Sequence, residues 1–134
     1  MAANRTFSDA GQLAAALTAA AERVGPAIAA AVGTEATALR DRIRSQASGR
    51  PGPNVITGAY RASWQVEVHP TGTGATAVVG TFAPQARRLE LGFVGADALG
   101  RIYAQPPFPH VAPAMAQTRA EFAQRVAQAV MGVL

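Results

Sequence analysis

The chain has no cysteine and no lysine, and only 6% of its 134 residues are aromatic. Without cysteine it has no disulfide bond, no thiolate nucleophile and no cysteine-ligated metal. It also has no stretch of eighteen apolar residues, so we expect no membrane-spanning segment and no membrane partner. A chain of this length is expected to form one domain, residues 1–134.

The patterns that catalytic and metal-binding sites need are missing as well. His69 and His110 have no carboxylate at a ligand spacing, and we expect both to lie at the surface or in turns. No serine stands in a G-x-S-x-G elbow, and the glycines at 72–80 lead into an expected strand, not a helix. We therefore expect no enzyme, no cofactor and no metal.

Positive charge is concentrated in one segment. Between Arg40 and Arg61 five arginines stand against one acid, Asp41, and this difference equals the formal net charge of +4 of the whole chain. Such a cluster can bind a polyanion, but it is also typical of a solvated helix end that carries arginines near its C-terminus. The candidates for contact with passing DNA are Arg40, Arg42, Arg44 and Arg50.

The N-terminal third predicts a helical arm over residues 1–48. Asp9 and Gln12 form a capping-box-like start, and apolar residues then recur at helical spacing as far as Ile43. Gly25-Pro26 should break or kink this helix, because proline lacks the backbone donor and clashes with the preceding turn. Glycines and prolines at 49–53 end the arm.

Alternating residues predict an antiparallel β-hairpin after the arm. Trp64, Val66 and Val68 share one face of a strand, residues 70–74 form a turn, and residues 75–82 form the second strand. A short helix should cover residues 85–90. Glu90 lies beside Arg87 and Arg88 in sequence, and we expect an ion pair here to anchor the following loop.

A final helix is expected from Pro113 onwards, since proline suits the first turn. An apolar stripe that includes Met115, Phe122 and Val126 should pack this helix on the sheet. The fold class predicted is therefore α+β: a long kinked helical arm, an antiparallel hairpin or small sheet, an extended loop and a covering C-terminal helix.

The segment 87–113 is rich in apolar residues among glycines and prolines, so we expect an extended docking loop, with a short strand possible at 102–104. Its apolar side chains either contact another subunit or fold back onto the chain as a packed loop, and both can hold for different residues. The candidate contact residues are Phe93, Val94, Leu99, Ile102, Tyr103 and Phe108.

Four motifs in order resemble one protein family. TGAYRAS at 57–63 resembles T-G-x-L-x-x-S, and VGT at 79–81 resembles the end of a strand in that family. The segment 82–92 resembles Y-A-x-x-x-E-x-G, and PPFPHVAPA at 106–114 resembles the entry to its last helix. The motif residues are Thr57, Gly58, Ser63, Gly80, Glu90, Gly92, Pro106, Pro107, Pro109 and Pro113.

These motifs are similar to those of the neck, head–tail joining or tail-completion proteins of tailed phages, typified by the tenth gene product of HK-ninety-seven-type phages and related to minor tail protein Z of phage lambda. The resemblance covers residues 57–134 as a family-like α+β core. It implies a non-catalytic virion protein of the tail and neck region, assembled in the bacterial host cytoplasm.

The resemblance also implies partners: copies of the chain in a closed ring, with a hexamer the expected number, and neighbouring head-closure and tail-terminator rings. Non-specific contact with passing duplex DNA is part of this hypothesis. The alternative from the arginine cluster is a small, non-specific nucleic-acid-binding module, although the chain lacks a groove-reading motif.

Overall fold

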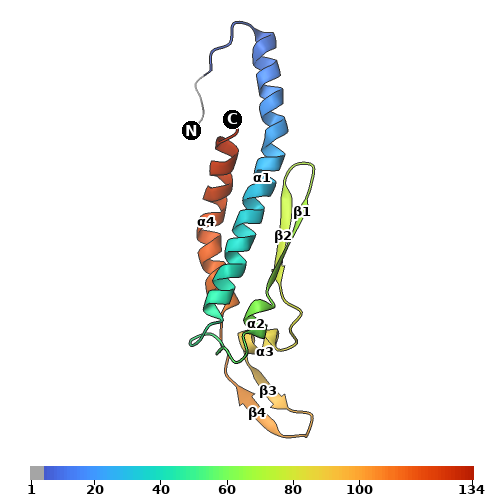
Figure 1. The fold of residues 1–134 in the computed structure, drawn as a ribbon, viewed down its shortest axis with the longest axis vertical. Coiled ribbons are helices and arrows are strands. Elements are labelled where there is room, and N and C mark those ends of the chain that lie inside the picture. Colours follow the sequence, from blue (N-terminus) through green and yellow to red (C-terminus); the bar gives the residue numbers. More distant parts are fainter. Residues whose placement is uncertain (1–4) are drawn as a thin grey trace.

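The computed structural model describes residues 5–134, and these residues form helices and two small antiparallel sheets, so the predicted α+β class is confirmed. The elements are α1 (Ala10–Gln46), α2 (Ala59–Ala62), β1 (Gln65–Pro70), β2 (Ala75–Gly80), α3 (Ala86–Leu91), β3 (Phe93–Ala96), β4 (Ile102–Gln105) and α4 (Val111–Met131). Figure 1 shows an elongated molecule built around α1.

The helix α1 begins as the sequence predicts, because the side chain of Asp9 accepts a hydrogen bond from the backbone N of Gln12 at 2.8 Å. Gly25-Pro26 was expected to break or kink this helix; the break is wrong, because α1 continues through Pro26 as one helix of 37 residues. Beyond Pro26 the helix packs against α4 and the first hairpin. This tertiary packing outweighs the local loss of one helical hydrogen bond.

The helix α1 lies between two other layers (Figure 1). On one side β1 and β2 form the predicted hairpin, with Val66 opposite Val79 and Val68 opposite Ala77. The turn of this hairpin also approaches α1, since a Cβ atom at Gly74 would lie 3.2 Å from the Ile28 side chain. On the other side α4 runs along α1.

The core lies where these layers meet at the foot of the first hairpin. Ile43, Trp64 and Ala114 are buried there, from α1, the start of β1 and the first turn of α4. Val79 and Val111 pack around them, so the beginning of α4 reaches the strands as predicted. Pro113 is the third residue of α4, which agrees with its expected place at the helix start.

The segment after α3 differs from the prediction. The short strand considered at 102–104 is present as β4, but the rest was expected to be an extended loop, whereas β3 and β4 form a second antiparallel hairpin, with Val94 opposite Ala104 and Ala96 opposite Ile102. Asp97 stabilises the turn of this hairpin, because its Oδ1 accepts hydrogen bonds from the backbone N atoms of Leu99 and Arg101. This hairpin projects from one end of the molecule (Figure 1).

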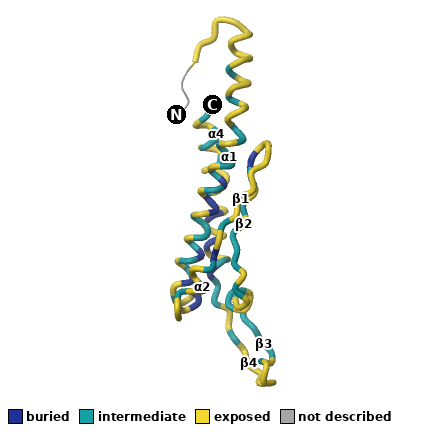
Figure 2. The backbone as a smooth tube through the Cα atoms, turned by 45° about the vertical axis from the view of Figure 1, so that its right-hand side comes forward, coloured by how far each residue is buried: buried dark blue, intermediate teal, exposed yellow. Residues whose placement is uncertain are grey.

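The opposite end is formed by the first half of α1, which is largely exposed (Figure 2). Among residues 5–134, α1 is the one helix long and apolar enough to cross a membrane, judged by length and composition alone. This is weak evidence, because helices of soluble proteins and signal sequences share the same composition. The expectation of no membrane partner therefore stays a prediction.

Candidate subunit-contact site

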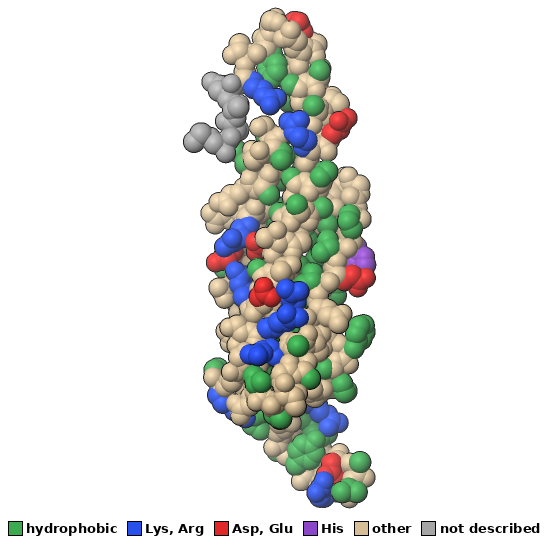
Figure 3. Space-filling view, in the orientation of Figure 1, with side chains coloured by type: hydrophobic (Ala, Val, Ile, Leu, Met, Phe, Trp, Pro, Cys, Tyr) green, Lys and Arg blue, Asp and Glu red, His purple; other side chains and the backbone are tan. Residues whose placement is uncertain are grey.

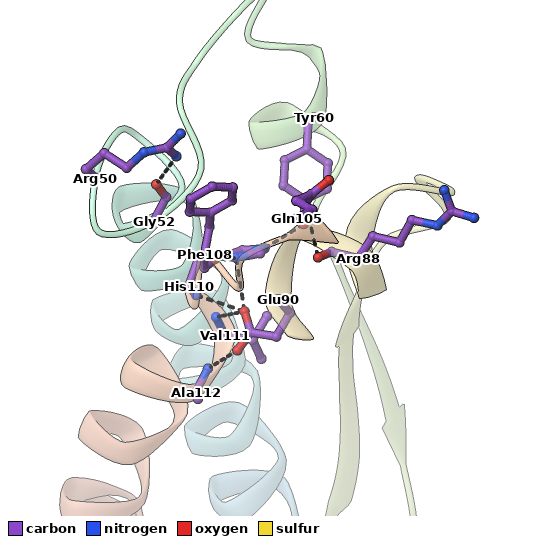
Figure 4. Close-up of polar contacts among 10 residues, drawn as sticks. All are labelled: Arg50, Gly52, Tyr60, Arg88, Glu90, Gln105, Phe108, His110, Val111 and Ala112. Atoms are coloured by element: carbon purple, nitrogen blue, oxygen red, sulfur yellow. Dashed lines mark hydrogen bonds and ion pairs between the residues drawn. The ribbon is translucent and has the colours of Figure 1, made fainter. Parts of the chain in front are cut away.

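Glu90 organises the end of the molecule from which the second hairpin projects (Figure 4). One carboxylate oxygen, Oε2, accepts hydrogen bonds from the backbone N of His110 at 2.8 Å and of Val111 at 3.0 Å. The other, Oε1, accepts from the backbone N of Ala112 at 2.9 Å. Glu90 thus caps α4 from another element, and among the described residues it forms no ion pair with Arg87 or Arg88, contrary to the expectation.

The cap also determines how Glu90 titrates. Burial raises the pKa of Glu90, but hydrogen bonds from the backbone of Val111, His110 and Ala112 outweigh it and hold the pKa below its usual value. An ionised carboxylate at a helix N-terminus is the favourable arrangement, because the free N–H groups carry partial positive charge. Glu90 therefore acts as a structural cap in its charged form.

His110 is fully buried just before α4, so the expectation of a surface position for it was wrong. Its Nδ1 lies 2.8 Å from the carbonyl oxygen of Phe108 and 3.0 Å from Oε2 of Glu90, and its Nε2 lies 2.5 Å from the hydroxyl of Tyr60. A carbonyl only accepts, so Nδ1 carries the proton in the neutral ring and Nε2 accepts from the Tyr60 hydroxyl. Burial raises the pKa of Tyr60 to about 12.

Hydrogen bonds join the end of the second hairpin and the segment after it to α3. Phe108 donates its backbone N–H to the carbonyl of Leu89 at 2.7 Å, and the side chain of Gln105 donates to the carbonyl of Arg88. Gly92 takes a φ of 78°, and a Cβ atom there would lie 2.8 Å from the carbonyl oxygen of Gln105. Two chain segments therefore approach so closely at Gly92 that only glycine fits.

The remaining motif residues lie at the ends of elements around the same region. Gly58 precedes α2 with a φ of 84°, and Thr57 accepts a hydrogen bond from the backbone of Ala59. Ser63 and Thr81 join the start of β1 to the end of β2 through their hydroxyls, which are 2.6 Å apart. The prolines connect β4 to α4 or occupy its first turn: Pro106, Pro107, Pro109 and Pro113.

The predicted contact residues divide between two environments. Phe93 and Tyr103 pack together with ring centroids 5.3 Å apart, and the guanidinium of Arg88 lies 3.9 Å from the Phe93 centroid. Phe108 is covered in the same way by Arg50, at 3.8 Å. Phe93 and Phe108 are thus partly covered within their own chain, as the fold-back interpretation expects, whereas Tyr103 remains 37% exposed.

The aliphatic candidates are instead exposed. Val94 is 77% exposed, Ile102 is 82% exposed, and Leu99 in the turn is 78% exposed. The register places Val94, Ala96, Ile102 and Ala104 on one face of the hairpin, because residues opposite each other or two apart share a face. We call this set the hairpin face; hydrophobic side chains are visible on the projecting end in Figure 3.

A groove between α1, β2 and α4 was not anticipated from the sequence. It has a volume of about 650 Å³ and an apolar lining that includes Val32, Leu39, Val78, Met115 and Phe122. Met115 and Phe122 belong to the stripe expected to cover the sheet, but Ala114 and Thr118 are the residues that α4 buries. The sequence carried a signal for this difference. Ala114 and Thr118 lie four residues apart and share one face of the helix, whereas Met115 and Phe122 lie on the neighbouring face.

Each of the four candidate DNA-contact arginines binds a group of its own chain. Arg40 pairs with Asp41 at 3.1 Å. Arg42 pairs with Glu121 on α4, and Arg44 donates to the backbone carbonyl of Trp64 at 2.7 Å. Arg50 donates to the carbonyl of Gly52 and covers Phe108. Arg42, Arg44 and Arg50 therefore join segments that are distant in sequence, and contact of the cluster with DNA stays a prediction.

Within residues 5–134 no group of three or more histidine or acidic side chains is placed to hold a metal ion. His69 is exposed at the strand, with Nε2 3.2 Å from a carboxylate oxygen of Glu67. No family model, curated protein or solved structure matches the chain. The candidate site is the pair of apolar surfaces formed by the exposed hairpin face and the groove.

Proposed function

We propose that the chain is a structural virion protein of the head–tail junction of a long-tailed phage, a neck or tail-completion protein, as the motif resemblance implies. The supporting observation is its exposed surface. The chain exposes 8826 Å², whereas a compact monomer of 13.7 kDa exposes about 6,600 Å². The excess of about 2,200 Å² favours a subunit that is completed by other chains.

This excess is large in comparison with ordinary interfaces. A stable protein–protein contact covers about 800 Å² on each partner, so the excess is enough for two such contacts. A subunit of a closed ring needs two, one with each neighbour. A ring, with six copies as the expected number, would stack on head-closure and tail-terminator rings around the DNA passage.

A genetic experiment tests this proposal. A nonsense mutation in the gene, made in the phage or prophage that encodes the chain, should leave DNA-filled heads and finished tails that do not join, as counted by electron microscopy. Mass spectrometry of purified wild-type virions should detect the chain. Normal joining in the mutant, together with virions that lack the chain, would refute the proposal.

The arginine-rich segment 40–61 supports the alternative of a small nucleic-acid-binding module. The internal contacts of its arginines weaken that support, because a guanidinium already bound to a carboxylate or carbonyl is less available to phosphate. Titration of the isolated chain with a 20-base-pair duplex at several salt concentrations separates the two functions. Tight binding by the monomer, steeply weakened by salt, would favour the alternative.

A further inference from the structure

Other elements support the helix α1 over only part of its length. Gly25 approaches the turn of the first hairpin, because a Cβ atom there would lie 3.2 Å from the carbonyl oxygen of Gly72. One turn of the helix away, the side chain of Arg23 donates to the carbonyl oxygen of Val133, just after α4, at 3.1 Å. The first hairpin and α4 therefore both end beside the same part of α1 (Figure 1).

The part of α1 before this level, residues 10–24, has little tertiary support, and we call it the α1 extension. None of these described residues is buried, and Leu17 is 61% exposed. The residues that α1 buries begin only at Val32. Among residues 5–134, Arg23 is the one member of the α1 extension whose side chain hydrogen-bonds another element. Figure 2 shows this end of the molecule as almost entirely exposed.

Pro26 lies at the boundary between the supported and the unsupported part of α1. Its backbone nitrogen carries no hydrogen, so the carbonyl of Glu22 lacks the donor that position 26 of a helix normally supplies. An interior proline ring also crowds the carbonyl four residues before it, which is a common cause of helix bending. The weakest point in the hydrogen bonding of α1 therefore coincides with the end of its tertiary support.

A helical segment of this length is marginal by itself in water. Isolated helices shorter than about 12–15 residues are barely stable even when they are rich in alanine, because the first hydrogen-bonded turn is costly to form. The α1 extension must therefore be held by the helix that follows it, and the missing donor at Pro26 weakens that support. Segments with few buried contacts open locally before the rest of a protein unfolds.

We propose that Gly25-Pro26 is a hinge about which the α1 extension bends and opens while the rest of the chain stays folded. Pro26 weakens the helix at this point, and the contact of Gly25 with the hairpin turn holds one side of the hinge against the body. The inference is independent of the head–tail function.

The hinge separates two properties of the chain. The buried cluster of Ile43, Trp64 and Ala114 lies beyond the hinge, so movement of the α1 extension leaves the core intact. The α1 extension is about 22 Å long at 1.5 Å per residue, so a small bend at its base displaces its tip by several ångströms. In such devices a few residues absorb the motion and the segments on either side move as units.

Spin-label distances test the hinge directly, because the chain has no cysteine of its own. Thr18→Cys with Thr34→Cys places exposed labels eight residues before and eight residues after Pro26. Ala112→Cys with Gln128→Cys is the matched control, because these exposed positions have the same spacing within α4. Double electron–electron resonance should give a broad distribution that extends to shorter distances for the first pair, and a narrow distribution for the control. Equal widths would overturn the inference.

Hydrogen exchange measured by mass spectrometry tests the local opening. Amides at 14–24 should exchange at least a hundredfold faster than those at 32–43, whereas one rigid helix would protect both segments to a similar degree. Pro26→Ala restores the missing donor, so it should slow exchange at 14–24 at least tenfold and narrow the first distance distribution. Pro113→Ala is the control and should change neither, since the first turn of a helix does not need that donor.

The remaining outcomes are also decisive. If the control pair in α4 is as broad as the first pair, the motion is not confined to the α1 extension and the inference is wrong. If Pro26→Ala changes neither the exchange nor the distance distribution, the proline does not form the hinge and the inference is wrong. Exchange of the wild-type chain needs no substitution, so equal protection of the two segments overturns the inference even where a labelled variant fails to fold.

Discussion

The carboxylate of Glu90 accepts a hydrogen bond at 2.8 Å from the backbone N of His110, a residue twenty positions further along the chain. The same carboxylate binds the next two N–H groups of α4, so a residue of α3 caps a distant helix. The second hairpin lies between these two residues in sequence. Its ends are thereby held together, and its direction relative to the body is defined.

Replacing Glu90 with glutamine should destabilise the protein by about 1–2 kcal/mol, because a neutral amide oxygen cannot satisfy three N–H groups of the helix N-terminus. Urea unfolding followed by circular dichroism measures the change. Glu67→Gln is the control, since the side chain of Glu67 is 70% exposed and its loss should change stability little. Equal effects of the two substitutions would contradict the capping role.

The contribution of Glu90 should depend on pH. Its folded pKa lies below the usual value, so its stabilisation is fully present above the unfolded pKa of about 4.3 and is lost as pH falls through the folded pKa. The difference in unfolding free energy between wild type and Glu90→Gln should therefore be constant from pH 7 to about pH 5 and shrink below about pH 4. A difference that grows on acidification would show the opposite linkage.

Tyr60→Phe should cost about 1–3 kcal/mol, because it leaves Nε2 of the fully buried His110 without its donor. Tyr103→Phe serves as the matched control. The Tyr103 hydroxyl accepts a hydrogen bond from Arg88 in an exposed setting, so its removal should change the unfolding free energy by less than about 0.5 kcal/mol. Thermal unfolding of the two variants under one buffer condition makes the comparison.

Three glycine substitutions should rank in a definite order. Gly92→Ala should be the most harmful, since it combines a positive φ with a Cβ contact of 2.8 Å to a backbone oxygen. Gly100→Ala meets open space at a φ of 77° and should cost only the left-handed penalty of about 1–2 kcal/mol. Gly80→Ala should be the least harmful, since Gly80 has no positive φ and a Cβ atom there has no other atom within 4 Å. Any other order in urea unfolding would contradict the close approach at Gly92.

Pro26→Ala should stabilise the protein by about 1–3 kcal/mol, because it restores a donor in the interior of α1. Pro113→Ala should have little effect, since the first turn of a helix does not need that donor. Thermal melting temperatures of the two variants provide the measurement. If Pro113→Ala raised the melting temperature and Pro26→Ala did not, the cost assigned to a proline in the helix interior would be contradicted.

Local patterns were sufficient to predict much of the fold. The cap at Asp9, the alternation from Trp64 to Val68 and the proline in the first turn of α4 each specify an element through contacts between near neighbours in sequence. The sequence also indicated six apolar residues of segment 87–113 as candidates for contact with other chains; Val94 and Ile102 among them are exposed, and their contact with another chain stays a prediction.

The tertiary structure decided what depends on contacts between distant residues. Because α1 packs against other elements on both sides, the helix continues through Pro26. Because β3 pairs with β4, a segment expected to be a loop forms a hairpin. His110 is buried and Glu90 caps α4 only because three elements meet at one place, and no pattern of near neighbours in the sequence predicts that meeting. The groove exists because α4 faces α1 through Ala114 and Thr118, a choice of helix face that depends on the partner as well as on the helix.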